Sequence, residues 1–227
     1  MPKQEVYNLI ISDLTAAITD LPATRTDGKL YLTKNAVHGL FAKAALWKKD
    51  YNAVLTHTSA IINSASFTLT ADDKSWLTNA STTETIWAPP FSSIGSGFAW
   101  YFSGAFGAVV VQVCPVLRYA QVLLMDAEAE IATGNLSKAE QFLNILRTRN
   151  GLPFYVSFAN ATEASNALYA TWQTETYRQG DRFGNLQRWG IAESVLNVYG
   201  YRPNNNALPI PGSIMNAYPG IVQNPGY

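Results

Sequence analysis

Residues 118–153 read RYAQVLLMDAEAEIATGNLSKAEQFLNILRTRNGLP, and this stretch decides the fold. The part from Tyr119 to Thr133 is apolar nearly all round, which predicts a buried helix. Gly134-Asn135 supplies a turn. Four apolar residues then recur at helical spacing and predict the inner face of a return helix: Ala139, Phe142, Leu143 and Leu146. Gly151 is the expected C-cap, with Pro153 beyond it, so the stretch predicts a helical hairpin.

The N-terminal part of the chain repeats this plan. Apolar residues from Tyr7 to Leu21 recur at helical spacing, and Thr33 is a good N-cap for the next helix. Lys49-Asp50 makes a short turn before a partner helix. Small residues let these helices approach closely: Ala36, Gly39, Ala42 and Ala45. Two such hairpins resemble tetratricopeptide units, so we expect a mainly α fold of tetratricopeptide-like hairpins in one domain over residues 1–227.

The rest of the chain has a weaker helical pattern. A third helix is predicted from about Glu163 to Gln179, and a short helix after Gly190 that reaches Val198. The proline-rich remainder, from Pro203 onward, is expected to be irregular and extended.

Composition excludes several classes of protein. The formal net charge is zero and only 14% of residues are charged, so no basic face for nucleic acid is apparent. An aromatic content of 12% suits neutral polar ligands instead. The single cysteine, Cys114, excludes an intrachain disulfide and a multi-cysteine metal site. His38 and His57 have no nearby metal-ligand pattern, and we expect no metal and no cofactor.

No segment approaches the roughly 18 apolar residues of a membrane span. Residues 1–6 show no signal peptide, and Cys114 is too far along the chain for a lipid-anchor cysteine. Any membrane association would therefore need an N-terminal lipid anchor that this sequence does not contain.

The segment from Thr68 to Val116 is rich in Ser, Thr, Gly and aromatic residues and has no helical period. Thr85-Ile86-Trp87 is a candidate short strand. We expect the remainder to form an irregular, aromatic-rich loop layer. Sugars present flat C–H faces on which exposed rings stack, and five aromatic residues here are the ligand candidates: Trp76, Phe98, Trp100, Tyr101 and Phe102.

Three charges lie on or beside the apolar faces of the hairpin at 118–153: Glu128, Arg147 and Arg149. A ligand-binding cluster is one interpretation. A structural ion pair that ties the two helices together is favoured, because an apolar helix carries a charge at low cost only when the charge is paired.

Four separated signatures follow one another in the C-terminal half. They are Arg118-Tyr119-Ala120 opening a helix that runs through Ala127-Glu128-Ala129; LNILRTRNGLP at 143–153; Gly180-Asp181-Arg182 followed by LQRWG at 186–190; and LPIP at 208–211 ahead of a terminal QNPGY at 223–227. Together, in this order, they resemble the SusD/RagB family of surface lipoproteins, which capture nutrients, mostly glycans, at the outer membrane of Bacteroidetes-type bacteria. The resemblance runs from about Tyr7 to Tyr227.

The resemblance implies non-catalytic capture of an extracellular nutrient, most often an oligosaccharide. It also implies a SusC-like TonB-dependent outer-membrane transporter as partner and a place on the cell surface. Family members are usually about twice as long and carry a first helical segment, so the sequence is expected to be a fragment or a shortened member. The family pattern places structural charges at Glu175, Arg182 and Arg188, whereas Gln179 and Asn185 stand where the family usually has acids.

Two other functions stay open. A tetratricopeptide-type adaptor would bind peptides through helix faces instead of loops. A glycosidase would need two carboxylates facing each other across a cleft, about 5 to 9.5 Å apart. No acid outside the helices stands out for that role.

Overall fold

The computed structural model describes residues 2–26, 29–72, 82–89, 116–177 and 179–227. Contacts divide the chain into two compact units, Met1–Glu175 and Thr176–Tyr227, where the sequence predicts one domain. Each unit is described by itself.

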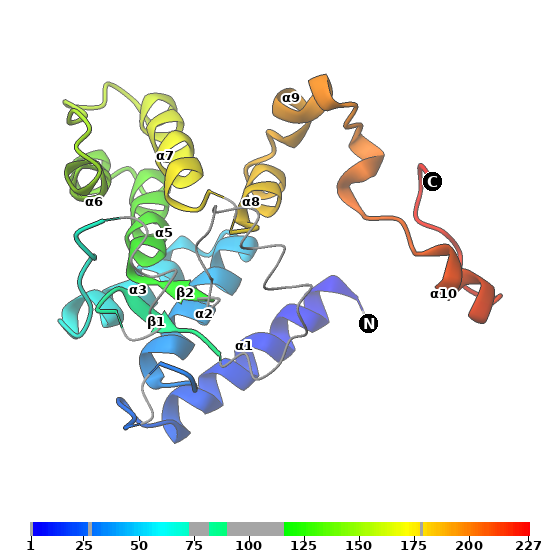
Figure 1. Ribbon diagram of the computed structural model, residues 1–227, viewed down its shortest axis with the longest axis horizontal. Coiled ribbons are helices and arrows are strands. Elements are labelled where there is room, and N and C mark those ends of the chain that lie inside the picture. Colours follow the sequence, from blue (N-terminus) through cyan, green and yellow to red (C-terminus); the bar gives the residue numbers. More distant parts are fainter. Residues whose placement is uncertain (1, 27–28, 73–81, 90–115, 178) are drawn as a thin grey trace. The chain divides into compact units, whose positions relative to one another are not determined.

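The first unit is a series of packed helices, as Figure 1 shows: α1 (Lys3–Asp20), α2 (Lys34–Lys48), α3 (Tyr51–Asn63), α5 (Tyr119–Ala132), α6 (Leu136–Arg149) and α7 (Ala161–Glu175). Helix α1 packs on α2, α2 on α3, α3 on α5, and α5 on both α6 and α7. The pairs α2–α3 and α5–α6 are the two predicted hairpins. The mainly α, tetratricopeptide-like prediction is confirmed.

The helix ends follow the predicted caps. The Thr33 side chain accepts a hydrogen bond from the Ala36 N–H (3.3 Å) at the start of α2. Gly151 has a φ of +64° after α6. The Gly151 N–H donates to the Thr148 carbonyl (3.1 Å) and the Leu152 N–H to the Arg147 carbonyl (2.9 Å), which is the Schellman arrangement.

Helix α5 is the centre of the first unit. Every residue from Ala120 to Ile131 is buried, as its all-round apolar pattern predicts. Three of these buried residues are acids: Asp126, Glu128 and Glu130. The core of this unit therefore contains charges that need partners.

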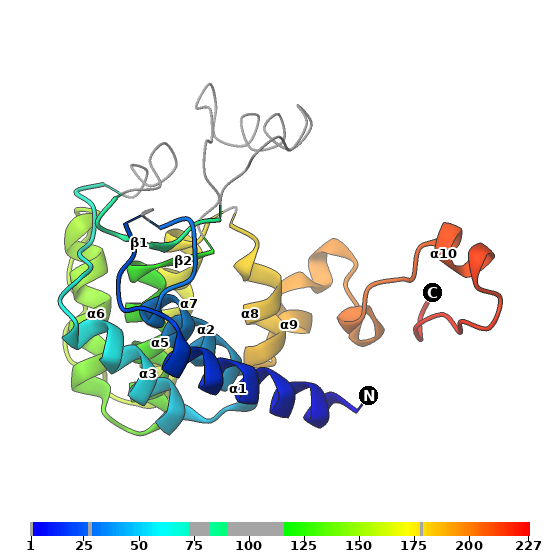
Figure 2. The same cartoon turned by 90° about the horizontal axis from the view of Figure 1, so that it is seen from below.

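Two short strands lie beside this core, as Figure 2 shows from a second direction: β1 (Thr85–Trp87), which was predicted, and β2 (Leu117–Arg118). They pair antiparallel, with Thr85 opposite Arg118 and Trp87 opposite Leu117. Gly39 of α2 allows a close approach here, because a Cβ at that position would lie 2.0 Å from a methyl carbon of Leu117.

The second unit contains α8 (Asp181–Trp189), α9 (Ala192–Leu196), the 3-10 turns η2 (Asn197–Tyr199) and η3 (Pro203–Asn206), and α10 (Gly212–Ala217). The prediction of one helix from Glu163 to Gln179 was wrong at its end. Helix α7 stops at Glu175, and Gly180, with a φ of +88°, precedes the separate helix α8. Helix α10 also forms in the stretch expected to be irregular.

None of the helices in the described ranges has both the length and the apolar content that crossing a bilayer requires.

Candidate functional site

The five aromatic ligand candidates (Trp76, Phe98, Trp100, Tyr101 and Phe102) fall at 73–81 and 90–115, outside the described residues. The structure does describe where the chain leaves for these segments and where it returns. The first departs after Asp72 and returns at Thr82. The second departs after Pro89 and returns at Val116.

Backbone hydrogen bonds join the two flanks of each segment near its base. The Thr68 N–H donates to the Thr83 carbonyl (3.1 Å), which closes the base of the first segment. The Val116 N–H donates to the Trp87 carbonyl (2.9 Å), which closes the base of the second. Lys43 of α2 also donates from Nζ to the Val116 carbonyl (2.9 Å). Both segments therefore start from the strand pair β1–β2 and its flanks.

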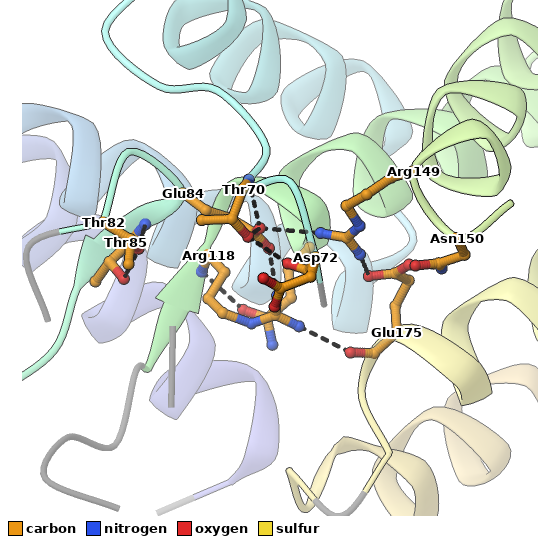
Figure 3. Close-up of polar contacts among 10 residues, drawn as sticks. Thr70, Asp72, Thr82, Glu84, Thr85, Arg118, Arg149, Asn150 and Glu175 are labelled. Atoms are coloured by element: carbon orange, nitrogen blue, oxygen red, sulfur yellow. Dashed lines mark hydrogen bonds and ion pairs between the residues drawn. The ribbon is translucent and has the colours of Figure 1, made fainter. Parts of the chain in front are cut away.

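A buried set of charges lies directly beneath these bases, and we call Glu84, Arg118, Arg149 and Glu175 the Glu84 cluster. Figure 3 shows Arg149 between the two carboxylates. Arg118 Nη1 and Arg149 Nη1 each donate to Glu84, the second at 2.9 Å. Arg149 Nη2 also pairs with the Glu175 carboxylate, and Arg118 Nη2 donates to the Glu175 carbonyl (2.8 Å). The cluster joins the turn before β1 to β2, α6 and α7.

Two neutral side chains extend the Glu84 cluster. Thr70, at the base of the first segment, donates to Glu84 Oε2 from its N–H (3.2 Å) and its hydroxyl (2.8 Å). The Asn150 amide donates to Glu175 Oε1 (2.7 Å). Glu84 thus connects the base of the first segment to Arg118. Arg118 follows the second segment and is the N-cap residue of α5.

The two positive and two negative charges of the cluster balance inside the protein. The Glu84 side chain is 0% exposed, and those of Arg149 and Glu175 are 4% and 1% exposed. Burial lowers the pKa of Arg118, and the attraction of Glu84 and Glu175 opposes that effect. Burial acts the same way on Arg149, but Glu175 and Glu84 together raise its pKa. Each carboxylate of the cluster is thus paired with at least one guanidinium group.

Of the charges singled out from the sequence, Arg149 and Glu175 meet in this cluster. Their partners Glu84 and Arg118 were not predicted as a pair. Arg147 lies elsewhere: its Nε donates to the Pro153 carbonyl and its guanidinium carbon lies 4.1 Å from the Tyr155 ring centroid. Arg149 therefore links the second hairpin to the turn before β1 and to α7, whereas the sequence predicts a link between α5 and α6. Glu128 is buried on α5, and its role as an ion-pair partner stays a prediction.

Arg182 and Arg188 belong to α8 in the second unit. Arg188 Nη2 donates to the Asn185 amide oxygen (3.0 Å), and its guanidinium lies 5.4 Å from the Trp189 ring centroid. Burial lowers the pKa of Arg182. A structural role for these two residues remains a prediction.

A second buried polar set, the Asp126 cluster, ties α3 to α5 and α6. The Thr58 hydroxyl donates to Asp126 Oδ2 (2.6 Å), and Lys138 Nζ lies 3.9 Å from Asp126 Oδ1. Lys138 also pairs with Glu130 (2.5 Å). Burial raises the pKa of Asp126, and the bond from Thr58 and the charge of Lys138 oppose that shift.

No group of three or more His, Cys, Asp and Glu side chains within the described ranges is arranged to hold a metal ion.

The sequence and the fold were compared with those of known proteins. A model of the SusD family matches residues 112–208. No curated protein sequence matches this chain.

Several solved structures have the same fold. A SusD-like protein from Bacteroides fragilis superposes with a TM-score of 0.79 at 16% identity, covering 100% of this chain and 72% of that one. A laminarin-binding SusD-like protein gives a TM-score of 0.77 at 20% identity, covering 99% and 69%. Surface glycan-binding protein A from Bacteroides thetaiotaomicron, in complex with laminarihexaose, gives 0.75 at 17% identity, covering 97% and 70%. The predicted resemblance to the SusD/RagB family is therefore confirmed, by the family's sequence pattern over residues 112–208 and by the SusD-like fold.

Proposed function

We propose that this protein captures an extracellular oligosaccharide without catalysing a reaction on it. The observation that carries the proposal is the shared fold with solved proteins whose names state glycan binding, including one bound to laminarihexaose. The site we propose is the pair of segments at 73–81 and 90–115, with Trp100 and Tyr101 as the principal stacking rings.

The architecture of the first unit supports this assignment. Hydrogen bonds close the bases of both segments beside the strand pair β1–β2, and Lys43 of α2 bonds to the base of the second segment, while the segments themselves contain the rings. Binding residues are commonly carried on loops that such scaffolds position. A neutral ligand also agrees with a chain of zero net charge, because charge steering contributes nothing to its capture.

The chemistry of the described carboxylates supports binding without catalysis. A glycosidase needs one carboxylic acid that donates a proton and one carboxylate that attacks or activates water. Glu84 and Glu175, the buried acids next to the segment bases, are both engaged by Arg149. We therefore assign them to support of the site instead of reaction.

Delivery completes the proposal. By family resemblance, the protein would stand over a SusC-like TonB-dependent transporter at the outer membrane of the cell and pass the oligosaccharide to it.

Calorimetric titration with a panel of neutral oligosaccharides, laminarihexaose included, tests the capture step. We expect saturable binding of at least one glycan and full recovery of that glycan unchanged after prolonged incubation. Chromatography of the incubated glycan is the control, because shortened products would show an enzyme. Binding of peptides with no glycan bound would favour the adaptor instead.

A further inference from the structure

The chain has two histidines, and the fold brings them together. His38 lies on α2 and His57 on α3, and their Nδ1 atoms are 2.8 Å apart. The ring centroids are 5.0 Å apart with planes tilted by 42°. This is a direct side-chain link between the two helices of the first hairpin, and it uses the one residue type whose ordinary pKa lies near 6.5.

At this distance, only one hydrogen can lie between the two Nδ1 atoms. With both imidazoles neutral, one Nδ1–H donates and the other Nδ1 accepts. Adding a single proton at a distant Nε2 leaves that bond in place. Once both rings are protonated, each Nδ1 carries a hydrogen, and two N–H groups and two positive charges face each other at 2.8 Å. The bond must then break.

The surroundings disfavour the doubly protonated pair. Phe41 stacks on His57 with ring centroids 3.7 Å apart, which takes one face of that imidazole away from water. Burial lowers the pKa of His38, and Lys34 lowers it further. Burial, and then the charge of His38, lower the pKa of His57 to about 4.

Charges on the elements packed against this hairpin complete the surroundings. Besides Lys34, the titratable groups on those elements are Lys43 and Lys48 on α2, Tyr51 on α3, Lys3, Glu5, Tyr7, Asp13 and Asp20 on α1, Tyr119, Asp126, Glu128 and Glu130 on α5, and Arg118 on β2. None of these groups is among the causes that shift the pKa of either imidazole. Within the described ranges, the charges that act on the two imidazoles are those of Lys34 and His38, and neither is a carboxylate.

We propose that the His38–His57 pair is a proton-sensitive link that holds α2 to α3 at neutral pH and releases them in acid. The sign follows from linkage. A histidine whose folded-state pKa lies below its unfolded value binds fewer protons in the folded state, so its contribution to stability falls as pH drops. For His57 the window runs from about 6.5 down to about 4.

Nitrogen-15 NMR of the imidazoles in the full chain tests the proton sharing. In the wild type we expect one ring to resist protonation until about pH 4. In His38→Gln, whose amide still bonds but cannot be charged, His57 should titrate closer to its ordinary pKa. Two independent titrations near 6.5 in the wild type would overturn the proposal.

Amide hydrogen exchange tests the release of the helices. After correction for intrinsic rates, acidification from pH 6.5 to 4 should speed exchange in α2 and α3 about tenfold more than in α5 and α6. The double variant His38→Gln, His57→Gln should lose that excess, and His38→Gln alone serves the comparison if the double variant does not fold. An equal excess in wild type and variant would contradict the link.

Discussion

The two buried polar clusters of the first unit differ in how their buried carboxylates are balanced by positive charges. The Glu84 cluster pairs two carboxylates with two arginines, and the side chains of Glu84, Arg149 and Glu175 are at most 4% exposed. The Asp126 cluster opposes Asp126 and Glu130 with one lysine, Lys138, whose side chain is 42% exposed. Charge balance is internal in the first case and shared with solvent in the second.

This difference sets how each cluster should respond to change. A buried ion pair contributes little relative to apolar residues of the same shape, but removing one member leaves an uncompensated charge at a cost of about 3–5 kcal/mol. A carboxyl with a raised pKa can instead become neutral. Removing one charge should therefore lower the free energy of unfolding much more in the Glu84 cluster than in the Asp126 cluster.

The largest effect is expected at Glu84. Glu84→Gln keeps the shape of the side chain but leaves Arg118 and Arg149 with one carboxylate between them. Urea denaturation should show a loss of about 3–5 kcal/mol in the free energy of unfolding. Glu193→Gln, at an exposed acid of the second unit, is the matched control and should change it by less than about 0.5 kcal/mol. If Glu84→Gln lowered the free energy of unfolding by less than about 1 kcal/mol, the Glu84 cluster would not be the more sensitive of the two.

An intermediate effect is expected at Glu128, which lies on α5 between Asp126 and Glu130 in sequence. Its side chain is buried in a helix with no exposed residue from Ala120 to Ile131. Glu128→Ala should cost about 2–3 kcal/mol, because a buried acid is retained where it compensates a positive charge that its removal would strand. A thermal melt unchanged by the substitution would show that Glu128 has no such structural role.

The smallest effect is expected at Asp126. Asp126→Asn can still accept the Thr58 hydroxyl bond and removes a charge whose burial is unfavourable. At pH 7 we expect a change of less than about 1 kcal/mol, in either direction, by urea denaturation.

The pH dependence of that variant sharpens the comparison. Because the folded-state pKa of Asp126 is raised above 3.8, the folded protein binds a proton that the unfolded chain has released. Its contribution to stability therefore falls as pH rises above about 4. Asp126→Asn should gain stability relative to the wild type between pH 4 and pH 7. A relative loss over that range would mean that ionised Asp126 is stabilising.

Sequence reasoning succeeded where the signal is local. The apolar pattern of 119–133, the Thr33 cap and the Gly151 ending each depend on neighbours within a few residues, and all three formed as predicted. The end of α7 was predicted at about Gln179 instead of Glu175, and α8 (Asp181–Trp189) was not predicted.

The Glu84 cluster could not be found in this way. Glu84 stands in a stretch without helical period, 34 residues before Arg118 and 65 before Arg149. No spacing rule connects positions so far apart, and their pairing depends on the packing of α6 and α7 beside the strands. The Arg118 signature was visible in the sequence, but its partner was not.

Binding by the aromatic segment tests the central claim most directly. The double change Trp100→Ala, Tyr101→Ala should weaken binding of an oligosaccharide at least several-fold, since each stacked ring contributes on the order of 1 kcal/mol. Tyr31→Ala, Trp47→Ala removes the same two ring types from exposed positions of the first unit and should leave affinity unchanged. Helical circular dichroism should be intact in both variants. Equal affinity before and after the change at Trp100 and Tyr101 would contradict capture through this segment, and loss of the fold would show that these rings belong to the core.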